Sequence, residues 1–493
     1  MNVHRAIIGG LVLLLPVVLI AAVEKEPLRK VDLSPEPKVK QDHAIALAPN
    51  GSSVAAAQAV STMSGRPPYE LRVWDAANGK EIANSKDKLN YEVAELQFSA
   101  DGKTVLTSSI RLLAERRPPR REDRGKPPGN EVFRTTTEIK LWDAETGKLR
   151  CTLAFPFAVG LFALSPDGQS LALEEWAVPK GPMTRPTGDF TLIRLYDVST
   201  SKPKIRATLP SANDPVACCT AIRFFPNSKH VAAAVCKRKG LQFVWEVAVW
   251  ETATGKPQGN ALELKETAQD EFQIERITWS FEPPMFAVTA SRKEKTDNAR
   301  PSYSTGIWEA SAFRDGPRAT IKHEDPLSHV LFSPDGKLAL TVSRFGQKDE
   351  KPFHYVQLWE VSTGKEVPVP SHKDMKGDIT AQFSPDSALL ALADSEGRLK
   401  LWNLAKNVQL IGYEASLPAR FDPLVFSPDS KALASVERRN TIKLWDATNG
   451  KEVATFTPTI DFSLKKDLRF SADGKKLTAF DGKTFTQWDA EMK

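Results

Sequence analysis

The stretch that decides the fold is Ile442-Lys443-Leu444-Trp445-Asp446, which is followed by the turn residues Gly450-Lys451. Its apolar and polar side chains alternate with a period of two, the pattern of a β-strand with one face packed against a neighbouring sheet. The tryptophan offers a large flat surface for that packing. A second stretch, Phe332-Ser333-Pro334-Asp335-Gly336, is typical of a strand that ends in a hairpin turn, because Pro, Asp and Gly favour turn conformations.

Both stretches recur along the chain. The tryptophan position is held by Trp74, Trp142, Trp250, Trp308, Trp359, Trp402, Trp445 and Trp488, and by Tyr196 in a ninth copy. The Phe332 position recurs at Phe98, Leu164, Phe383, Phe426 and Phe470, with weaker copies at Leu47, Phe224 and Trp279. Eight of the eleven tryptophans therefore occupy one position of a repeat. Each of the nine units predicts four short antiparallel strands, named a to d from the inside outward.

On these residues the chain resembles the WD-repeat family of β-propellers over roughly residues 28–493. The resemblance implies an all-β fold, a single propeller of eight or nine four-stranded antiparallel blades. Nine blades is the direct count, although most propellers have about four to eight. The alternative is eight blades with one incompletely inserted unit, either the first or the fifth.

The chain departs from the family in its polar residues. The family often carries a Gly-His pair before strand a, and here only His323 stands at the expected spacing before its phenylalanine. The Asp after the tryptophan is replaced in several units, by Glu251, Glu309, Glu360 and Asn403. We therefore expect apolar packing, rather than the family's buried polar network, to stabilise the blades.

The N-terminus predicts a targeting segment over residues 1–23. Arg5 is followed by an unbroken apolar run, Ala6–Val23, and by polar sequence from Glu24. This pattern fits a secretory signal peptide with small residues at Ala21-Ala22, and its length also fits an uncleaved apolar helix that tethers the chain to a membrane. Either interpretation predicts an extracytoplasmic protein that is periplasmic, secreted or membrane-anchored, with the propeller in residues 24–493.

The ends of the repeat region predict how the ring closes. The last unit, which contains Trp488, has no strand d of its own. Residues 28–34 precede the first unit at the spacing of a strand d. We expect them to complete the last blade, since pairing the two ends protects both exposed edges.

The spacing of the units predicts where the molecule varies. The distance from each tryptophan to the next phenylalanine position is nearly constant, whereas the distance from phenylalanine to tryptophan varies widely. Insertions therefore fall in the b–c connections, which leave the ring on the same face as the d–a connections. Insertions gathered on one face often mark a binding face.

Basic residues gather in these insertions and are the candidate binding residues. They are Arg116, Arg117, Arg120, Arg121 and Arg124 in the second unit, and Lys237, Arg238 and Lys239 in the fourth. One interpretation is a site for a protein partner or an anionic ligand. The other is a set of solvated loops with no specific partner. The net charge of +6 over the whole chain does not decide between them.

The sequence contains no motif for catalysis, cofactor binding or metal binding. It has no Gly-x-Ser-x-Gly or His-Glu-x-x-His stretch and no phosphate-binding glycine loop. Its four cysteines form no Cys-x-x-Cys pair. Nucleic acid is not expected, because no aromatic residues are interleaved with the basic ones. We expect a non-enzymatic interaction scaffold. The alternatives are a hydrolase-like or lactonase-like propeller enzyme with a site in its central channel, and a structural component of the cell envelope.

Overall fold

The computed structural model describes most of the repeat region. The described residues are 23–24, 29–32, 44–59, 69–76, 78, 80–85, 89, 93–115, 132–157, 159–176, 191–209, 218–239, 242–259, 262–265, 270–280, 285–294, 301–309, 316–323, 325–345, 353–368, 375, 378–414, 423–437, 441–457, 467–480 and 484–491.

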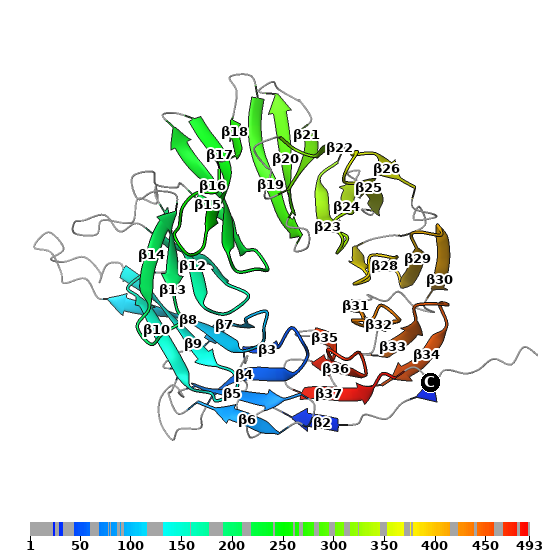
Figure 1. Ribbon diagram of the computed structural model, residues 1–493, viewed down its shortest axis with the longest axis horizontal. Helices are drawn as coiled ribbons and strands as arrows, with labels where there is room; N and C mark the ends of the chain where they lie inside the picture. Colours follow the sequence, from blue (N-terminus) through cyan, green and yellow to red (C-terminus); the bar gives the residue numbers. More distant parts are fainter. Residues whose placement is uncertain are drawn as a thin grey trace, which may run out of the picture.

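The described strands form nine sheets that follow one another around a ring (Figure 1), and successive strands of each sheet pair antiparallel. Each sheet is one blade, and its strand a lies innermost. The ring therefore has nine blades. The first and fifth units, which the eight-blade alternative left out, each form a complete four-stranded sheet.

The first five blades follow the chain in order. Blade 1 contains β3 (Ile45–Leu47), β4 (Ser53–Ala59), β5 (Tyr69–Asp75) and β6 (Glu81–Asn84). Blade 2 contains β7 (Val93–Phe98), β8 (Thr104–Glu115), β9 (Val132–Asp143) and β10 (Leu149–Phe155). Blade 3 contains β11 (Val159–Leu164), β12 (Ser170–Trp176), β13 (Thr191–Asp197) and β14 (Lys204–Leu209). Blade 4 contains β15 (Cys218–Phe224), β16 (His230–Lys239), β17 (Gln242–Glu251) and β18 (Leu262–Lys265). Blade 5 contains β19 (Asp270–Ser280), β20 (Met285–Glu294), β21 (Ser302–Glu309) and β22 (Ala319–His323).

The last four blades return the chain to its start. Blade 6 contains β23 (Leu327–Phe332), β24 (Leu338–Phe345), β25 (Phe353–Glu360) and β26 (Glu366–Val367). Blade 7 contains β27 (Ile379–Phe383), β28 (Leu389–Asp394), β29 (Arg398–Asn403) and β30 (Val408–Glu414). Blade 8 contains β31 (Leu424–Phe426), β32 (Ala432–Val436), β33 (Ile442–Asp446) and β34 (Glu452–Phe456). Blade 9 contains β35 (Asp467–Phe470), β36 (Lys476–Phe480) and β37 (Thr484–Asp489).

The N-terminal segment supplies the outer strands of the last two blades. β2 (Arg29–Asp32) is the fourth strand of blade 9 and pairs antiparallel with β37, from Arg29↔Gln487 to Asp32↔Thr484. β1 (Val23–Glu24) adds a fifth strand to blade 8 and pairs parallel with β34. β2 lies within the range 28–34 that was expected to pair with the last blade, whereas β1 lies before that range.

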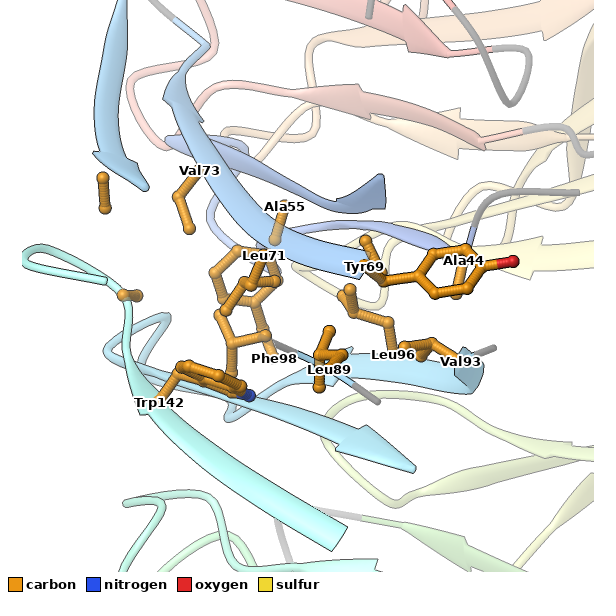
Figure 2. Close-up of a cluster of buried hydrophobic side chains, with 14 of the residues drawn as sticks. Ala44, Ala55, Tyr69, Leu71, Val73, Leu89, Val93, Leu96, Phe98 and Trp142 are labelled. Atoms are coloured by element: carbon orange, nitrogen blue, oxygen red, sulfur yellow. The ribbon is translucent and has the colours of Figure 1, made fainter. Parts of the chain in front are cut away.

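The hydrophobic core is divided into clusters that lie between neighbouring blades. In the cluster shown in Figure 2, Trp142 of blade 2 packs with Leu71 and Val73 of blade 1, and Phe98 lies among them. Trp142, Leu71 and Val73 are fully buried. Eight clusters combine residues of two neighbouring blades, from blades 1 and 2 to blades 8 and 9, so alternate side chains of a strand pack against different neighbours.

The apolar helix expected over residues 6–23 lies outside the described residues, except at its last position. Val23 is in a β-strand, so the helix does not extend to that residue. Within the residues that the structure describes, no helix is long and apolar enough to cross a membrane.

Candidate interaction surface

The two faces of the ring are built differently. On one face, the a–b connections are short and alike, as at residues 99–103, 165–169, 333–337, 384–388, 427–431 and 471–475. On the other face, the b–c connections differ from blade to blade, and residues 116–131 in blade 2 and 177–190 in blade 3 are the longest. We call this second face, which also carries the d–a connections, the hairpin face.

Part of the inserted sequence is strand rather than loop. In blade 2, β8 and β9 stay paired from Thr104↔Asp143 to Glu115↔Val132. In blade 4, β16 and β17 stay paired from His230↔Glu251 to Lys239↔Gln242, so only residues 240 and 241 connect them. Continuous backbone pairing gives these insertions a fixed direction at the hairpin face.

The predicted binding residues fall into two groups. Arg116, Arg117, Arg120, Arg121 and Arg124 lie outside the described residues, between β8 and β9. Lys237, Arg238 and Lys239 do not lie in a loop, because they form the end of strand β16. The structure therefore does not bring the two groups together as one described site.

The side chain of Lys237 differs most from the sequence expectation. It is buried with 5% exposure, and its Nζ lies 2.6 Å from Glu246 Oε2 on the facing strand, which is also 5% exposed. A buried ammonium requires such a partner, because an unpaired charge in this environment is costly. Lys237 is therefore part of the blade interior and does not offer its charge to a ligand.

Hydrogen bonds from the repeated tryptophans hold three of the blades. The indole N–H of Trp142 donates to Thr107 Oγ1 at 3.0 Å, that of Trp359 to Thr341 Oγ1 at 2.8 Å, and that of Trp445 to Ser435 Oγ at 3.0 Å. The indole nitrogens of Trp308 and Trp402 have no partner among the described residues. Blades 2, 6 and 8 therefore keep a buried polar contact at the tryptophan, whereas blades 5 and 7 lack it among the described residues.

Blade 3 replaces the tryptophan with Tyr196, and the polar contacts change with it. The Tyr196 hydroxyl donates to Glu175 Oε1, and Arg194 Nε lies 3.3 Å from Glu175 Oε2. Burial raises the pKa of Glu175 and that of Tyr196. A longer acceptor side chain on strand b thus compensates for the different reach of the tyrosine ring.

A second buried carboxylate joins blades 3 and 4 near their innermost strands. Glu174 Oε2 accepts the backbone N–H of Leu161 at 3.1 Å, and Glu174 Oε1 accepts that of Cys219 at 3.1 Å. Gly160 makes room for it, because a Cβ there would lie 2.3 Å from Glu174 Oε2. Both carboxylate oxygens accept hydrogen bonds within the fold, so Glu174 connects blade 3 with blade 4.

On the face opposite the hairpin face, hydrogen bonds join the a–b turns of neighbouring blades. Ser228, Ser387 and Ser430 occupy the position that is glycine in the other turns, with φ of 56°, 63° and 62°. Each hydroxyl accepts a backbone N–H from the turn of the preceding blade. These N–H groups belong to Asp167 at 3.1 Å, Asp335 at 2.9 Å and Asp386 at 3.1 Å. These serines adopt a left-handed conformation that is costly for L-residues, and the inter-blade bond offsets part of that cost.

The aspartate carboxylates of the a–b turns accept hydrogen bonds from residues of the same turn. Ser427 Oγ donates to Asp429 Oδ1 at 2.6 Å, and Ser471 Oγ donates to Asp473 Oδ1 at 2.5 Å. These hydrogen bonds lower the pKa of Asp429 and that of Asp473. Among the described residues, no group of three or more His, Cys, Asp and Glu side chains could hold a metal ion.

A row of polar side chains that crosses blade 5 is not indicated by any sequence motif. Ser291, Tyr303 and His323 are direct cross-strand partners on β20, β21 and β22. Ser291 Oγ donates to Glu275 Oε1 of β19 at 2.6 Å, which adds a carboxylate to the row. The four residues come from four strands, so no local motif could have indicated their contact.

Comparison with known proteins finds a likeness among solved structures. No protein-family model and no curated protein matches the sequence. Among solved structures, the chain is similar to a eukaryotic initiation factor, with 17% identity, 85% of this chain and 92% of that chain covered, and a TM-score of 0.53. It also matches the C-terminal WD40 domain of Sif2 (12% identity, 94% and 98% covered, TM-score 0.44) and the Dos1 propeller (12%, 94% and 96%, 0.45). At these identities the likeness concerns the fold alone.

Proposed function

We propose that this chain is a WD-repeat protein that acts as a non-enzymatic scaffold and binds a protein partner through its hairpin face. Propellers of this architecture commonly serve as platforms for protein partners. The observation that carries the proposal is the difference between the two faces. The a–b turns are uniform, whereas strand extensions and long connections are concentrated on the opposite side. Variable connections on a rigid scaffold are where binding residues are usually found.

The basic residues of the hairpin face indicate an acidic partner surface. Residues 116–131 contain Arg116, Arg117, Arg120, Arg121 and Arg124, and Arg238 and Lys239 end β16. Opposite charges on the two partners accelerate encounter, and salt weakens the attraction. Lys237 is not part of this proposal, because Glu246 neutralises it.

We also propose that the protein acts outside the cytoplasm. The apolar run Ala6–Val23 and the small residues Ala21-Ala22 support export. β1 is parallel to β34, and β34 runs from the c–d connection at 447–451 toward the hairpin face. The Val23 end of β1 therefore lies on the side opposite the hairpins. An anchor that is retained would turn the hairpin face away from its membrane.

A loop replacement tests the binding face. Glu115 and Val132 are the last paired residues of β8 and β9, so Asn-Gly in place of residues 116–131 closes the hairpin with a two-residue turn. The control variant carries Lys103→Glu, Lys229→Glu and Lys431→Glu, which change exposed residues of the a–b turns. Both are compared with the full chain in affinity capture from the native envelope, at low and high salt.

The two variants have opposite expected results. The loop replacement should lose a salt-sensitive partner while the control retains it, with unchanged circular dichroism in both. Retention of the partner by the loop replacement, or its loss in the control alone, would contradict the proposed face. N-terminal sequencing of protein isolated from the producing cells tests export, and recovery of the intact N-terminus in the cytosolic fraction would contradict it.

A further inference from the structure

The β8–β9 hairpin of blade 2 extends beyond the other two strands of its sheet. β8 and β9 stay paired as far as Glu115↔Val132. On the outer side, β10 pairs with β9 only as far as Phe155↔Thr137. Among the described residues, no strand pairs with residues 132–136 on the side of β9 that faces away from β8. We call this side of residues 132–136 the open edge of β9.

The chain after β10 turns away from the open edge. It bends at Pro156 and Phe157, and proline has no backbone N–H with which to continue the pairing. Val159 already belongs to β11, where it pairs with Glu175 of blade 3. The Val159 N–H donates to Thr137 Oγ1 at 3.1 Å, which fixes the point at which the chain leaves blade 2. The described part of this connection therefore leaves the open edge uncovered.

The backbone direction of β9 shows which groups lie at the open edge. The Asp143 N–H donates to the Lys148 carbonyl at 2.9 Å, so it faces the side of β10. The register of β9 with β8 has no shift between Asp143 and Val132. Because the backbone groups of successive residues point alternately to the two sides of a strand, those of Phe133 and Thr135 also face the side of β10. These N–H and C=O groups are available to an added strand.

The open edge lacks the features that usually keep a sheet edge unpaired. Such edges are very short, or they carry proline, lysine or a bulge. Residues 132–136 read Val-Phe-Arg-Thr-Thr, with no proline and no lysine, and their residue types favour strands. Two partly buried aromatic side chains, Phe155 and Phe157, lie at the base of the edge with ring centroids 5.7 Å apart. They offer apolar surface to the first residues of an added strand.

The sequence around the open edge is basic. The extended part of the hairpin, residues 110–115 and 132–136, contains Arg111, Arg134 and Glu115, and Arg111 is exposed. The connecting residues 116–131 contain six basic and three acidic residues. Charge complementarity therefore favours an acidic strand at this edge. A second copy of the same hairpin is disfavoured, because it would bring like charges together.

We propose that the open edge of β9 binds an extended acidic segment of the protein partner, which adds to blade 2 as a strand beyond the end of β10. The inference rests on the proposed scaffold function and gives the partner a structural class. Backbone hydrogen bonds to Phe133 and Thr135 hold the added strand, and its acidic residues complement the basic hairpin. Residues 116–131 are not part of this pairing, so the two contacts can be tested separately.

The probe is a fluorescein-labelled peptide, Glu-Val-Thr-Val-Glu-Val-Thr-Val-Glu, whose fluorescence anisotropy is measured during titration with the full chain. One counterpart has lysine in place of each glutamate. The other keeps the sequence and carries N-methyl groups on its three central residues, which blocks both of its edges. The acidic peptide should bind at least about tenfold more tightly than either counterpart, because one loses the favourable charge and the other loses backbone hydrogen bonds.

Two substitutions of Thr135 separate the backbone from the side chain. Thr135→Pro removes the N–H that faces the open edge and keeps the backbone groups that pair with β8, so it should weaken the acidic peptide at least about fivefold. Thr135→Val keeps this N–H and should bind the peptide within about twofold of the original chain. Circular dichroism shows whether each variant is folded. If Thr135→Pro fails to fold, the N-methylated peptide still decides on the unchanged chain.

Several results would overturn the proposed edge. They are no binding of the acidic peptide, equal binding of either counterpart, unchanged binding by Thr135→Pro, or an equal loss in Thr135→Val. A dimer in sedimentation that Thr135→Pro dissociates would also overturn it, because a second copy then occupies the edge.

Failure of the edge can be distinguished from failure of the scaffold, because the Asn-Gly replacement of residues 116–131 retains the open edge. If that replacement loses the captured partner while the acidic peptide binds no better than its counterparts, the edge is wrong and the scaffold stands. If the peptides and the Thr135 variants behave as expected but no partner is captured, the scaffold is wrong.

Discussion

The inter-blade hydrogen bond of Ser387 offers a quantitative test of how the ring is held. Ser387 has φ of 63°, and its Oγ accepts the Asp335 N–H of the preceding blade at 2.9 Å. Ser387→Ala removes this acceptor and keeps the left-handed conformation. Ser387→Gly removes the same acceptor and relieves the conformation. The pair of variants separates the hydrogen bond from the backbone strain.

The expected magnitudes follow from the two contributions. A neutral hydrogen bond contributes about 1 kcal/mol to stability, and the exposed site places this one at the lower end of the range. A left-handed residue other than glycine costs roughly 1 kcal/mol. Ser387→Ala should therefore lower the free energy of unfolding by about 0.5–1 kcal/mol. In Ser387→Gly the lost bond and the relieved strain nearly cancel, so its stability should stay within about 0.5 kcal/mol of the original chain.

Urea unfolding followed by tryptophan fluorescence measures both variants, and the midpoint is compared at constant slope. The same alanine substitution at Ser228 and Ser430 should add a similar loss at each position, since these serines bond the turns of other blade pairs. If Ser387→Ala leaves the stability unchanged while Ser387→Gly raises it by about 1 kcal/mol, the view that the serines hold neighbouring blades together is refuted.

Three further predictions concern the buried polar groups. Thr107→Val should lower the free energy of unfolding in urea by about 1–3 kcal/mol, because it leaves the indole N–H of Trp142 buried without its acceptor. An unchanged free energy of unfolding would contradict the role of that hydrogen bond. Lys237→Met and Glu246→Leu should each lower the free energy of unfolding by about 3–5 kcal/mol, because each leaves one buried charge without its partner. The double variant, which removes both charges, should lie within about 1 kcal/mol of the original chain. Additive losses in the double variant would contradict the ion pair. Burial lowers the pKa of His323 from 6.5 to about 4, so its neutral form is favoured in the folded state. Stability should then fall as the pH is lowered from about 6.5 to 4, and an unchanged pH slope in His323→Phe would show that His323 is not the group responsible.

The sequence predicts the ring because its determinants are local. The alternation of Ile442–Asp446 and the turn chemistry of Ser333–Gly336 depend on neighbouring residues, and every unit repeats them. The structure confirms the count of nine blades, because each of the nine units forms a sheet. The acceptors of the tryptophan N–H groups were also visible, since Thr107, Thr341 and Ser435 stand at one common spacing after their phenylalanine positions. This common spacing is the sequence pattern that indicates the three hydrogen-bond acceptors.

The sequence does not predict which insertions become strands. Lys237-Arg238-Lys239 looks like a basic loop in isolation. Its burial depends on Glu246, which reaches Lys237 only because β16 and β17 pair along their full length. Pairing between strands depends on register, which spacing alone leaves open.

Contacts between distant segments are the hardest to predict. Val23 ends an apolar run that favours a helix, yet β34 of blade 8 recruits it as an edge strand. The polar row of blade 5 combines residues of four strands, so no motif identifies it. In both cases, the ring geometry determines which residues meet.

The most direct test of the binding face is hydrogen exchange of the chain with and without its captured partner. We expect slower exchange in the β8–β9, β16–β17 and β20–β21 hairpins, with unchanged exchange in the a–b turns such as residues 427–431. Protection confined to the a–b turns or to the outer strands would contradict a scaffold that binds through its hairpin face.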